Sequence, residues 1–544
     1  MQPRPNTREG LVRLRSATII SAFATALAAT IGPAIAQKQG GTLSFYHRDS
    51  PPGPSLLEES TVSSVHPFAN IYNNLVVFDR TKPKNSLDTI VPDLAKSWSW
   101  DQSGTKLTFQ LNEGVRWHDG KPFTARDVQC TWHMLIGKTE TDDFRKNPRK
   151  AWWFNLDEVA VKGDYEVTFN LKQPQPSFLL LLAAGWSVVY PCHVPQRVMR
   201  TTPIGTGPFK FDDFRRNDSI RLVRNPDYFK KGKPYLDAIE VKIIENRSTR
   251  ILAFTAGKFD LTYRSDVTVP LLKDVQSQAP KAQCELAPTG VSINLIVNRL
   301  SPPFDNPEIR KAMALALDRD AFVQILSQGK ASIGGAMLPT PEGVWGMPPE
   351  YLATLPGYGA DRDKNLAQAR GIMEGLGYSA TKPLAVKVAT RNIAEFRDPA
   401  VILIDQLKQI HIAGELEVID TAQWYNRVTR REYAVGLNLT GASVDDPDVN
   451  LVENYSCKSE RNYTQYCNAD VEKLIGQQSK ETDIAKRKQL VWDIEKVLVE
   501  DVARPIISHG YAATCWHPRV KNLKLFQNSI YNDGRLEDVW LDDD

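Results

Sequence analysis

The stretch from Val91 to Leu135 reads VPDLAKSWSWDQSGTKLTFQLNEGVRWHDGKPFTARDVQCTWHML. Within it, Lys106–Leu111 alternates polar and apolar residues, which predicts a strand with one buried face. The turn residues Asp101–Gly104 come directly before, so we expect Ser97–Trp100 to be the hairpin partner of this strand. Further on, Thr124–Asp127 resembles a capping box, with an acid in the last position, and should start a helix. The stretch therefore predicts a hairpin followed by a capped helix that packs on it.

The exact residues of this stretch are more informative than its predicted secondary structure. Pro92–Trp98 reads PDLAKSW, Leu111–Val128 reads LNEGVRWHDGKPFTARDV, and a later segment, Pro203–Phe209, reads PIGTGPF. Together these segments resemble the signature of the solute-binding proteins that serve peptide and nickel ABC importers, solute-binding protein family 5. The resemblance runs from about Gly40 to the C-terminus. It implies an α/β protein with the large bilobal periplasmic-binding-protein fold (type II, cluster C) and an extra small domain.

The length of the chain agrees with several lobes. Single hydrophobic cores stop growing beyond about 250–300 residues, and this chain has 544. The alternation of strand, helix and strand across 384–420 is typical of an α/β lobe. The resemblance implies the following order: signal peptide 1–36, first part of lobe I 37–76, extra small domain of lobe I 77–200, second part of lobe I 201–288, lobe II 289–508, and a C-terminal return to lobe I 509–544.

Residues 1–36 predict an export signal. Four arginines and one glutamate mark a basic start, the small and mostly apolar run Ala17–Ile31 follows, and Ala34–Ala36 matches the small-x-small cleavage pattern. The run is short and rich in Ala and Thr, which argues against a permanent membrane anchor. The segment has no adjacent arginine pair and no cysteine near the cut, so we expect the general secretory route and no lipid anchor. The mature protein is therefore expected free in the periplasm.

Charge and motifs narrow the classes of function. Outside residues 1–36 the basic and acidic residues are equal in number, so we expect neither a nucleic-acid nor an anionic-membrane partner. The sequence has no G-x-S-x-G, H-E-x-x-H or phosphate-loop motif, and its eight histidines are scattered. We therefore expect no enzyme, no metal site and no cofactor, and we expect Trp117, His118 and Asp119 to serve packing and turns. An exported hydrolase stays as an alternative, because many carboxylates are present.

The six cysteines are expected to play unequal roles. Cys457 and Cys467 flank a short polar stretch, and the resemblance to dipeptide-binding proteins implies a disulfide between them. Export permits such a bond. Cys130 is expected to pack as a small hydrophobic residue on the predicted helix, and the remaining three have no evident partners. None is spaced C-x-x-C, so zinc and thioredoxin-like sites are not expected.

The resemblance also implies where a ligand binds. The first candidates are Tyr46, His47 and Arg48 at the end of the first mature strand, with Tyr263 and Arg264 after a later short strand. In the family, the residues at both places lie next to the ligand. These side chains would meet a solute enclosed between the two lobes.

Arg391 follows a predicted strand and resembles the arginine that dipeptide binders present to the ligand carboxylate. A guanidinium suits that role because it donates two parallel hydrogen bonds. A plain surface-loop arginine is the alternative, and Arg397 is a second choice. Trp424 could supply an apolar wall of the site, or could be a core residue.

One departure from the family pattern concerns the ligand's amino group. Peptide binders carry an aspartate for it, after a strand that ends in a Gly-Trp-like pair. Here Leu439 stands where the Trp is usual, and Ala442 stands roughly where the aspartate is expected. Asp445 or Asp446 could substitute from a shifted loop, or could only shape the turn before Pro447.

These observations predict a periplasmic solute receptor. The resemblance implies that it captures a small organic solute, a short peptide or a peptide-like or opine-like compound, and delivers it unchanged to ABC permease subunits in the inner membrane with a cytoplasmic ATPase. It is expected to act as a monomer. A sugar-phosphate conjugate or a nickel-type metal chelate is an alternative solute, and a chaperone or adhesion role on the same scaffold is a third class of function.

Overall fold

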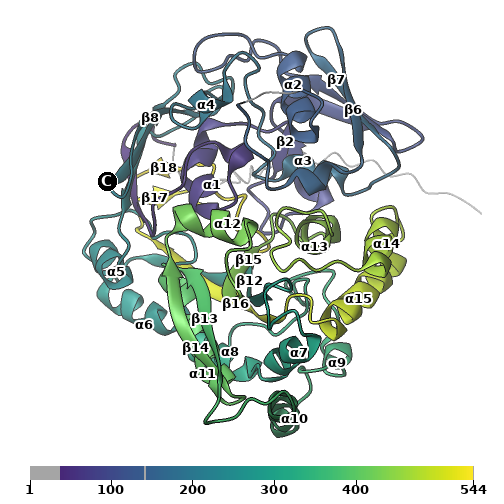
Figure 1. Cartoon of the computed structure of the whole chain (residues 1–544). Helices are drawn as coiled ribbons and strands as arrows, with labels where there is room; N and C mark the ends of the chain where they lie inside the picture. Colours follow the sequence, from purple (N-terminus) through teal and green to yellow (C-terminus); the bar gives the residue numbers. More distant parts are fainter. Residues whose placement is uncertain (1–36, 140–142, 543–544) are drawn as a thin grey trace, which may run out of the picture. The chain divides into compact units, whose positions relative to one another are not determined.

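The structure is a computed structural model that describes residues 37–139 and 143–542. From Lys38 onward the chain forms one compact unit of mixed helices and strands (Figure 1). The signal peptide predicted at 1–36 lies outside the described residues. Among the helices of the described part, none is both long enough and apolar enough to cross a membrane.

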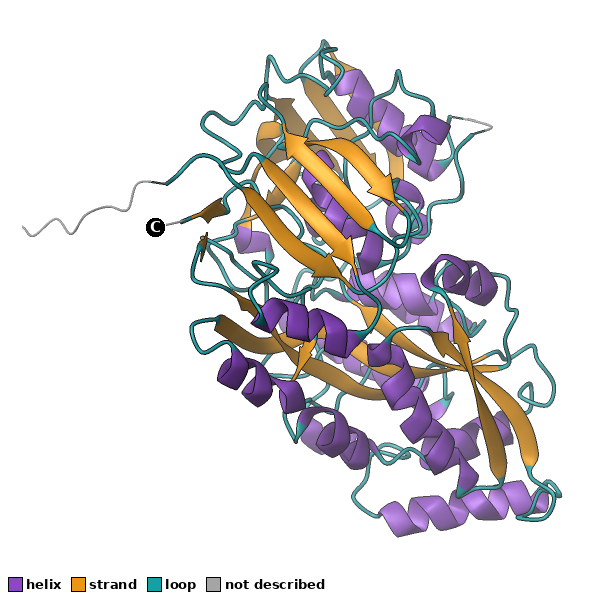
Figure 2. Cartoon of the chain, turned by 90° about the vertical axis from the view of Figure 1, so that its left-hand side faces the viewer, coloured by secondary structure: helices purple, strands orange, loops and turns teal. Residues whose placement is uncertain are grey.

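One sheet of four strands organises the part that we call the first lobe. Its order is β1 (Thr42–His47), β10 (Ala238–Ile243), β9 (Ser219–Arg224) and β8 (Phe209–Arg215). β1 and β10 are parallel, and the other neighbours are antiparallel. Strands far apart in sequence therefore lie side by side in this sheet. Figure 2 shows the sheets of the unit as separate groups of strands.

A second four-stranded sheet contains the stretch on which the sequence analysis began. Its antiparallel order is β4 (Ala95–Trp100), β5 (Lys106–Leu111), β7 (Glu166–Leu171) and β6 (Leu156–Lys162). Helix α2 (Ala125–Ile136) packs against β6 and β7. The Thr124 amide donates to the Asp127 carboxylate at 2.9 Å, so the predicted hairpin, cap and helix are all confirmed.

A six-stranded sheet runs from the base of the first lobe into the part that we call the second lobe. Its order is β11 (Val267–Thr268), β16 (Ile506–Trp516), β12 (Gln283–Val297), β15 (Val435–Gly441), β13 (Leu384–Arg391) and β14 (Ile412–Ile419). β13 is parallel to both of its neighbours, β14 and β15. The α/β character predicted for this part is confirmed.

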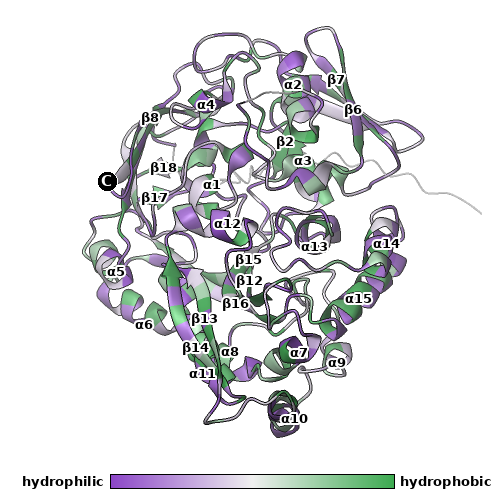
Figure 3. Ribbon diagram, viewed as in Figure 1, coloured by the Kyte–Doolittle hydropathy of each residue, from purple (hydrophilic) through white to green (hydrophobic). Residues whose placement is uncertain are grey.

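The remaining elements cover these sheets or connect them. The helices are α1 (Val62–Phe68), α3 (Phe178–Ala183), α4 (Gln196–Met199), α5 (Arg247–Thr255), α6 (Val269–Gln278), α7 (Pro307–Leu315), α8 (Arg319–Ser327), α9 (Pro349–Leu352), α10 (Arg362–Gly375), α11 (Ala394–Lys408), α12 (Thr421–Thr429), α13 (Pro447–Tyr455), α14 (Ala469–Gln478) and α15 (Ile484–Glu500). Short strands lie at β2 (Val76–Phe78), β3 (Ile90–Pro92), β17 (Val520–Lys521) and β18 (Trp540–Leu541). Helix α15 carries both apolar and polar residues (Figure 3), and its apolar residues Val491, Ile494 and Leu498 are buried at helical spacing.

Two long antiparallel strands, β12 and β16, connect the lobes. Residues 283–288 of β12 pair with 511–516 of β16 beside the first-lobe cluster of Phe254 and Tyr263, whereas Leu295 and Val297 belong to the second-lobe core. The register shifts between Pro288 and Ser292. We call β12 and β16 the hinge strands, because they are continuous through both lobes and irregular in between.

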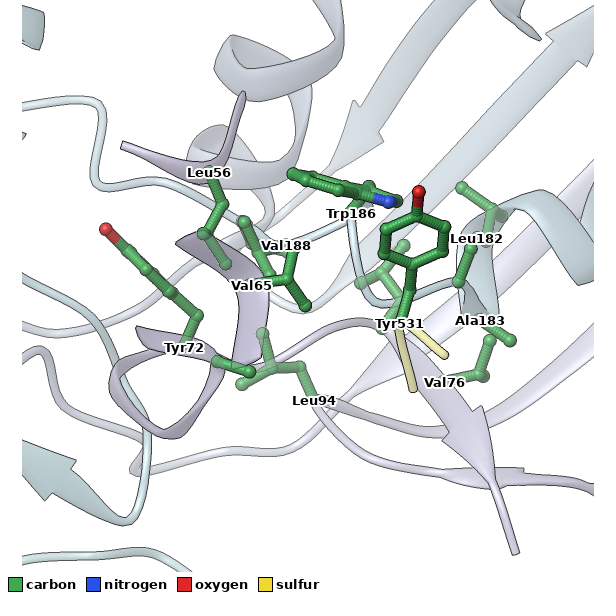
Figure 4. Close-up of a cluster of buried hydrophobic side chains, with 14 of the residues drawn as sticks. Leu56, Val65, Tyr72, Val76, Leu94, Leu182, Ala183, Trp186, Val188 and Tyr531 are labelled. Carbon is green, nitrogen blue, oxygen red and sulfur yellow. The ribbon is translucent and has the colours of Figure 1, made fainter. Parts of the chain in front are cut away.

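The C-terminal segment returns to the first lobe. Tyr531 packs among buried side chains from the segments 56–94 and 182–188 (Figure 4). The labelled members of this cluster are Leu56, Val65, Tyr72, Val76, Leu94, Leu182, Ala183, Trp186, Val188 and Tyr531. The Tyr531 and Trp186 rings lie 5.3 Å apart. This packing agrees with a return of the chain after the second lobe, and the boundaries given above stay predictions.

Three disulfides join the six cysteines. Cys457 and Cys467 are bonded, at the place that the resemblance implied. The prediction for Cys130 was wrong, because it pairs with Cys192 across 62 residues, and Cys284 pairs with Cys515 between the hinge strands. Each of these two pairs joins residues that only the fold brings together, so no local sequence pattern predicts them.

The PIGTGPF segment is held against the first lobe by close backbone contact. A Cβ atom on Gly205 would lie 1.8 Å from the carbonyl oxygen of Ile71, and one on Gly207 would lie 2.4 Å from that of Asn70. The Gly207 amide donates to the Ile71 carbonyl at 2.9 Å. His118 connects the small sheet to the same segment, since its Nδ1 accepts from the Gly205 amide at 3.3 Å and its Nε2 lies 3.0 Å from the Gly207 carbonyl.

The first prediction concerns Gly205. Gly205→Ala should lower the free energy of unfolding by about 3 kcal/mol or more, because backbone must move to admit the methyl group. Gly476→Ala is the matched control: Gly476 lies in α14 with nothing within 4 Å of its added Cβ, so this change should stabilise by roughly 0.5–1 kcal/mol. Urea unfolding of both variants checks the pair, and equal effects would contradict the close contact.

The second prediction concerns the pH dependence of stability. Burial lowers the pKa of His118 to about 4, below its ordinary value of 6.5. The unfolded chain therefore binds the proton more tightly, and stability is full above about pH 6.5 and falls as the pH drops towards 4, by about 1.4 kcal/mol per pKa unit. His118→Gln should flatten part of this slope in urea unfolding. A slope that is the same in His118→Gln as in the wild-type protein would contradict the contribution of the buried imidazole.

Candidate functional site

A cavity of about 140 Å³ lies between the lobes and against both hinge strands. Its charged lining residues come from both lobes: Arg48 and Arg247 from the first, and Arg391, Glu395 and Asp398 from the second. Its apolar and aromatic lining residues include Val62, Val291, Ile293, Leu326, Phe396, Tyr425, Leu439, Tyr511, Ile530 and Tyr531. A mostly apolar enclosure with a few charged groups is the usual form of a small-molecule site.

Two larger cavities lie elsewhere. One, of about 340 Å³, is lined by first-lobe residues such as Val77, Arg80 and Arg535. The other, of about 470 Å³, lies on the far side of Tyr425, between Glu59 and Arg461. Neither is lined by β12 or β16. We place the candidate site in the smaller cavity, because a movement of the lobes about the hinge strands would open and close it.

Arg391 lies at the carboxyl end of β13 and is almost fully buried, with 1% of its surface exposed. Its guanidinium forms an ion pair with Asp49 of the first lobe at 2.8 Å. It also donates to the Thr421 hydroxyl at 2.8 Å and to the Tyr425 hydroxyl at 3.3 Å. The pair of Arg391 and Asp49, which we call the interlobe ion pair, therefore joins the two lobes.

Asp49 is as fully bonded as Arg391. The Ser63 hydroxyl donates to its two oxygens at 2.8 and 3.0 Å, and the Thr421 hydroxyl also donates to it. Burial alone would raise the pKa of the Asp49 carboxyl, but Arg391 and the neighbouring cations hold that pKa below its usual range. Asp49 is thus charged, and its charge is compensated inside the protein.

A second set of charges meets at the cavity wall. Glu395, near the start of α11, lies 3.6 Å from the guanidinium groups of Arg48, Arg247 and Arg250. Burial would raise the pKa of the Glu395 carboxyl, but these three arginines hold it far below the usual range. Asp398 accepts from Arg247 at 3.0 Å. The site therefore contains charges of both signs, distributed over both lobes.

Behind this set, Arg250 and Asp266 form a fully buried pair. Two hydrogen bonds of 2.8 and 2.6 Å join them, and the Tyr46 hydroxyl donates to the same carboxylate at 2.9 Å. Burial raises the pKa of Asp266, and the charge of Glu395 adds to that effect. Tyr46 therefore supports the wall of the site without lining the cavity.

The residues predicted from the sequence lie at different distances from the cavity. Arg48 and Arg391 line the cavity. His47 and Tyr263 lie one layer behind: Tyr263 stacks on Arg48 at 4.8 Å, and the Nδ1 of His47 contacts the Asp49 backbone at 2.5 Å. Arg264 is placed elsewhere, in an ion pair of 2.8 Å with Asp533 that fixes the C-terminal return.

The other predicted residues also lie away from the cavity. Trp424 is a core residue of the second lobe, with no exposed surface. Asp446 caps α13 and accepts two hydrogen bonds from Arg487, at 2.9 and 2.7 Å. Asp445 accepts from the Val344 amide at 2.7 Å, and burial raises its pKa to about 7. Both aspartates lie at the loop before Pro447, and neither lines the cavity. Arg397 does not line the cavity either.

Sequence reasoning missed Glu395, Phe396 and Tyr425. The helix that carries the first two, α11, begins at Ala394, three residues after β13 ends, and brings both side chains to the cavity. A usable signal existed: ligands of open α/β sheets bind beyond the carboxyl ends of parallel strands, and this helix follows the parallel strand β13. No cluster of His, Cys, Asp or Glu suited to a metal ion occurs within residues 37–139 and 143–542.

Comparison with known proteins agrees with this geometry. The family model described as bacterial extracellular solute-binding proteins, family 5 (middle), matches residues 89–462. A probable di/tripeptide-binding protein 5 of Pseudomonas aeruginosa is 26% identical over 503 residues, which covers 87% of this chain and 90% of that protein.

Two solved structures are similar in fold. One is the periplasmic binding protein DppA from Helicobacter pylori in complex with the peptide STSA, with a TM-score of 0.79, 22% identity, and coverage of 93% of this chain and 98% of the other. The other is Haemophilus influenzae OppA in complex with RPPGFSPFR, with a TM-score of 0.82, 18% identity, and coverage of 93% and 99%. The expected bilobal α/β fold is confirmed by these matches.

The third prediction tests the interlobe ion pair. Asp49→Asn leaves Arg391 buried without a carboxylate, and should lower the free energy of unfolding by about 3–5 kcal/mol. Asp212→Asn is the control, because Asp212 pairs with Arg221 at 2.7 Å where both side chains are more than 40% exposed, and solvent screens such a pair so that its loss should have little effect on stability. Urea unfolding measures both, and a cost for Asp49→Asn no greater than the control would contradict the buried pair.

Proposed function

The chain belongs to family 5 of the bacterial extracellular solute-binding proteins, and on this premise we propose that it binds a short peptide, or a peptide-like zwitterion, in the cavity between its lobes. Members of this family are the solute-binding components of ABC importers and are not enzymes. The chain has the same role: it receives a solute and delivers it to a permease, with no chemical step.

The observation that carries the choice of solute is the charge of the site. The cavity presents arginines from both lobes and carboxylates from the second lobe, and the surrounding ion pairs leave it close to neutral. Burying a net charge costs free energy unless an opposite charge meets it. A solute with one positive and one negative group adds no net charge, and each group finds a partner. The relative from Pseudomonas aeruginosa is named for di- and tripeptides, which supports the same class.

We also propose the cellular setting. Residues 1–36 are removed as a signal peptide, the mature protein works free in the periplasm as a monomer, and the lobe boundaries are those given under Sequence analysis. The hinge strands supply the movement between an open and a closed form. A solute that contacts both lobes stabilises the closed form, because those contacts exist only there.

The fourth prediction is a binding test. Thermal melting of the purified protein with dipeptides, tripeptides, an opine and a nickel–histidine chelate should show a saturable rise only with the peptides. At a concentration 100 times Kd the added stability is about 2.7 kcal/mol. Native mass spectrometry of freshly purified protein should show a peptide mass that leaves on denaturation.

Two results would contradict this proposal. Saturable binding of the opine or the chelate, with no binding of the peptides, would support the role as a solute receptor and contradict the proposal that the solute is a peptide. Chromatography of the mixture would detect any conversion of a probe into a product, and such turnover would show that the protein is an enzyme and not a receptor.

A further inference from the structure

We propose that Arg48 and Glu395 bind the two charged groups of the solute, while Arg391, with Asp49, holds the lobes together. Arg48 would bind the solute carboxylate and Glu395 the solute ammonium group. This inference rests on the proposed function and names the residues that give it specificity. It reverses the expectation that Arg391 binds the carboxylate.

Arg391 has little capacity left for a solute. Its guanidinium donates to Asp49, Thr421, Ser63 and Tyr425, at distances of 2.8 to 3.3 Å. The carboxylate that it needs is already supplied by Asp49. A solute carboxylate could replace Asp49 only by leaving that aspartate buried without its cation, which is costly.

Arg48, by contrast with Arg391, has hydrogen-bond donors that the protein does not use. It is 6% exposed and lines the cavity, yet no hydrogen bond from its guanidinium to another protein group is found in the described part of the chain, and its buried Nε has no partner. Its guanidinium stacks on the Tyr263 ring at 4.8 Å, which fixes its plane. A carboxylate in the cavity would therefore meet a positioned guanidinium with free donors.

Glu395 has free acceptors in the same way. Within the described residues no N–H group or alcohol hydroxyl donates to either of its buried carboxylate oxygens, and the Asp266 carboxyl forms a side-chain hydrogen bond with the Glu395 carboxyl. Its three arginine neighbours lie at 3.6 Å, close enough to keep it charged and too far for good hydrogen bonds. An ionised carboxylate accepts up to about four hydrogen bonds. An ammonium group of the solute can supply them.

This arrangement also accounts for Ala442. That position has no carboxylate, and its backbone amide donates to the Gly290 carbonyl at 3.0 Å. Asp445 and Asp446 are held outside the cavity by partners of their own. Of the two carboxylates that line the cavity, Asp398 accepts from Arg247, whereas no N–H group of the described residues donates to Glu395. Glu395 is therefore the acid that can replace the missing aspartate.

The charges balance only when both ends of a zwitterion bind. Around the cavity, Arg48, Arg247 and Arg250 are matched by Glu395, Asp398 and Asp266. A solute carboxylate alone would add a negative charge beside Glu395, and an amine alone would add a positive charge beside the arginines. We therefore expect peptides with both termini free to bind better than peptides with one terminus blocked.

The fifth prediction uses three probes: Ala-Phe, N-acetyl-Ala-Phe and Ala-Phe amide. Isothermal titration calorimetry should show that the wild-type protein prefers Ala-Phe over each blocked form by roughly 10- to 100-fold. In Glu395→Gln the ratio of the affinity for Ala-Phe to that for N-acetyl-Ala-Phe should fall to about one. The preference of this variant for Ala-Phe over Ala-Phe amide should remain. In Arg48→Gln the preference over the amide should be lost, and that over the acetylated form kept.

Glu417→Gln is the matched control, because Glu417, on β14, pairs with Arg427 away from the cavity. This variant should keep both preferences. If Glu395→Gln or Arg48→Gln does not fold, Glu395→Asp and Arg48→Lys should reduce the same preference at least in part. Unchanged preferences, or an equal loss for all three probes, would show that Arg48 and Glu395 only hold the lobes together and would overturn the inference alone. Failure of the wild-type protein to bind any probe would overturn the peptide proposal and this inference with it.

Discussion

The structure depends on the burial of charge between two lobes. Arg391 on the second lobe and Asp49 on the first each lose their water when the lobes meet, and each would be costly alone. Their mutual contact, together with the hydroxyl groups of Ser63 and Thr421, removes that cost only in one relative position of the lobes. The geometry of this pair thus determines where the walls of the cavity face each other, and so which side chains a solute can contact.

The contrast between satisfied and unsatisfied charges gives the site its function. The Arg391–Asp49 and Arg250–Asp266 pairs are complete and rigid, and they keep the neighbouring groups in place. Arg48 and Glu395 lie beside them with hydrogen-bonding capacity unused. Completing such groups is favourable, and a bound molecule can do it where the protein does not. One set of arginines and carboxylates therefore contains both ion pairs that stabilise the walls of the cavity and charged groups with unused hydrogen-bonding capacity that a solute can bind.

The sequence predicts the local features well and the long-range ones poorly. The hairpin, the cap at Thr124 and the helix α2 follow from patterns within a few residues, and the family follows from a few specific segments. By contrast, the Cys130–Cys192 bond, the contact of Asp49 with Arg391 and the approach of Glu395 to three arginines join residues that are 62 or more apart. No periodicity records such contacts. The position of Arg391 was predicted, but its partner was not, and the partner changes its role.

The bond between Cys284 and Cys515 has a mechanical consequence. It cross-links β12 to β16 at the first-lobe end of their pairing, ahead of the register shift between Pro288 and Ser292. Two ribbons clamped at one end cannot slide past each other there, so any flexing is confined to the irregular segment beyond the clamp. Any rotation of the second lobe would then be centred on that segment, and the resulting displacement would grow with distance from it.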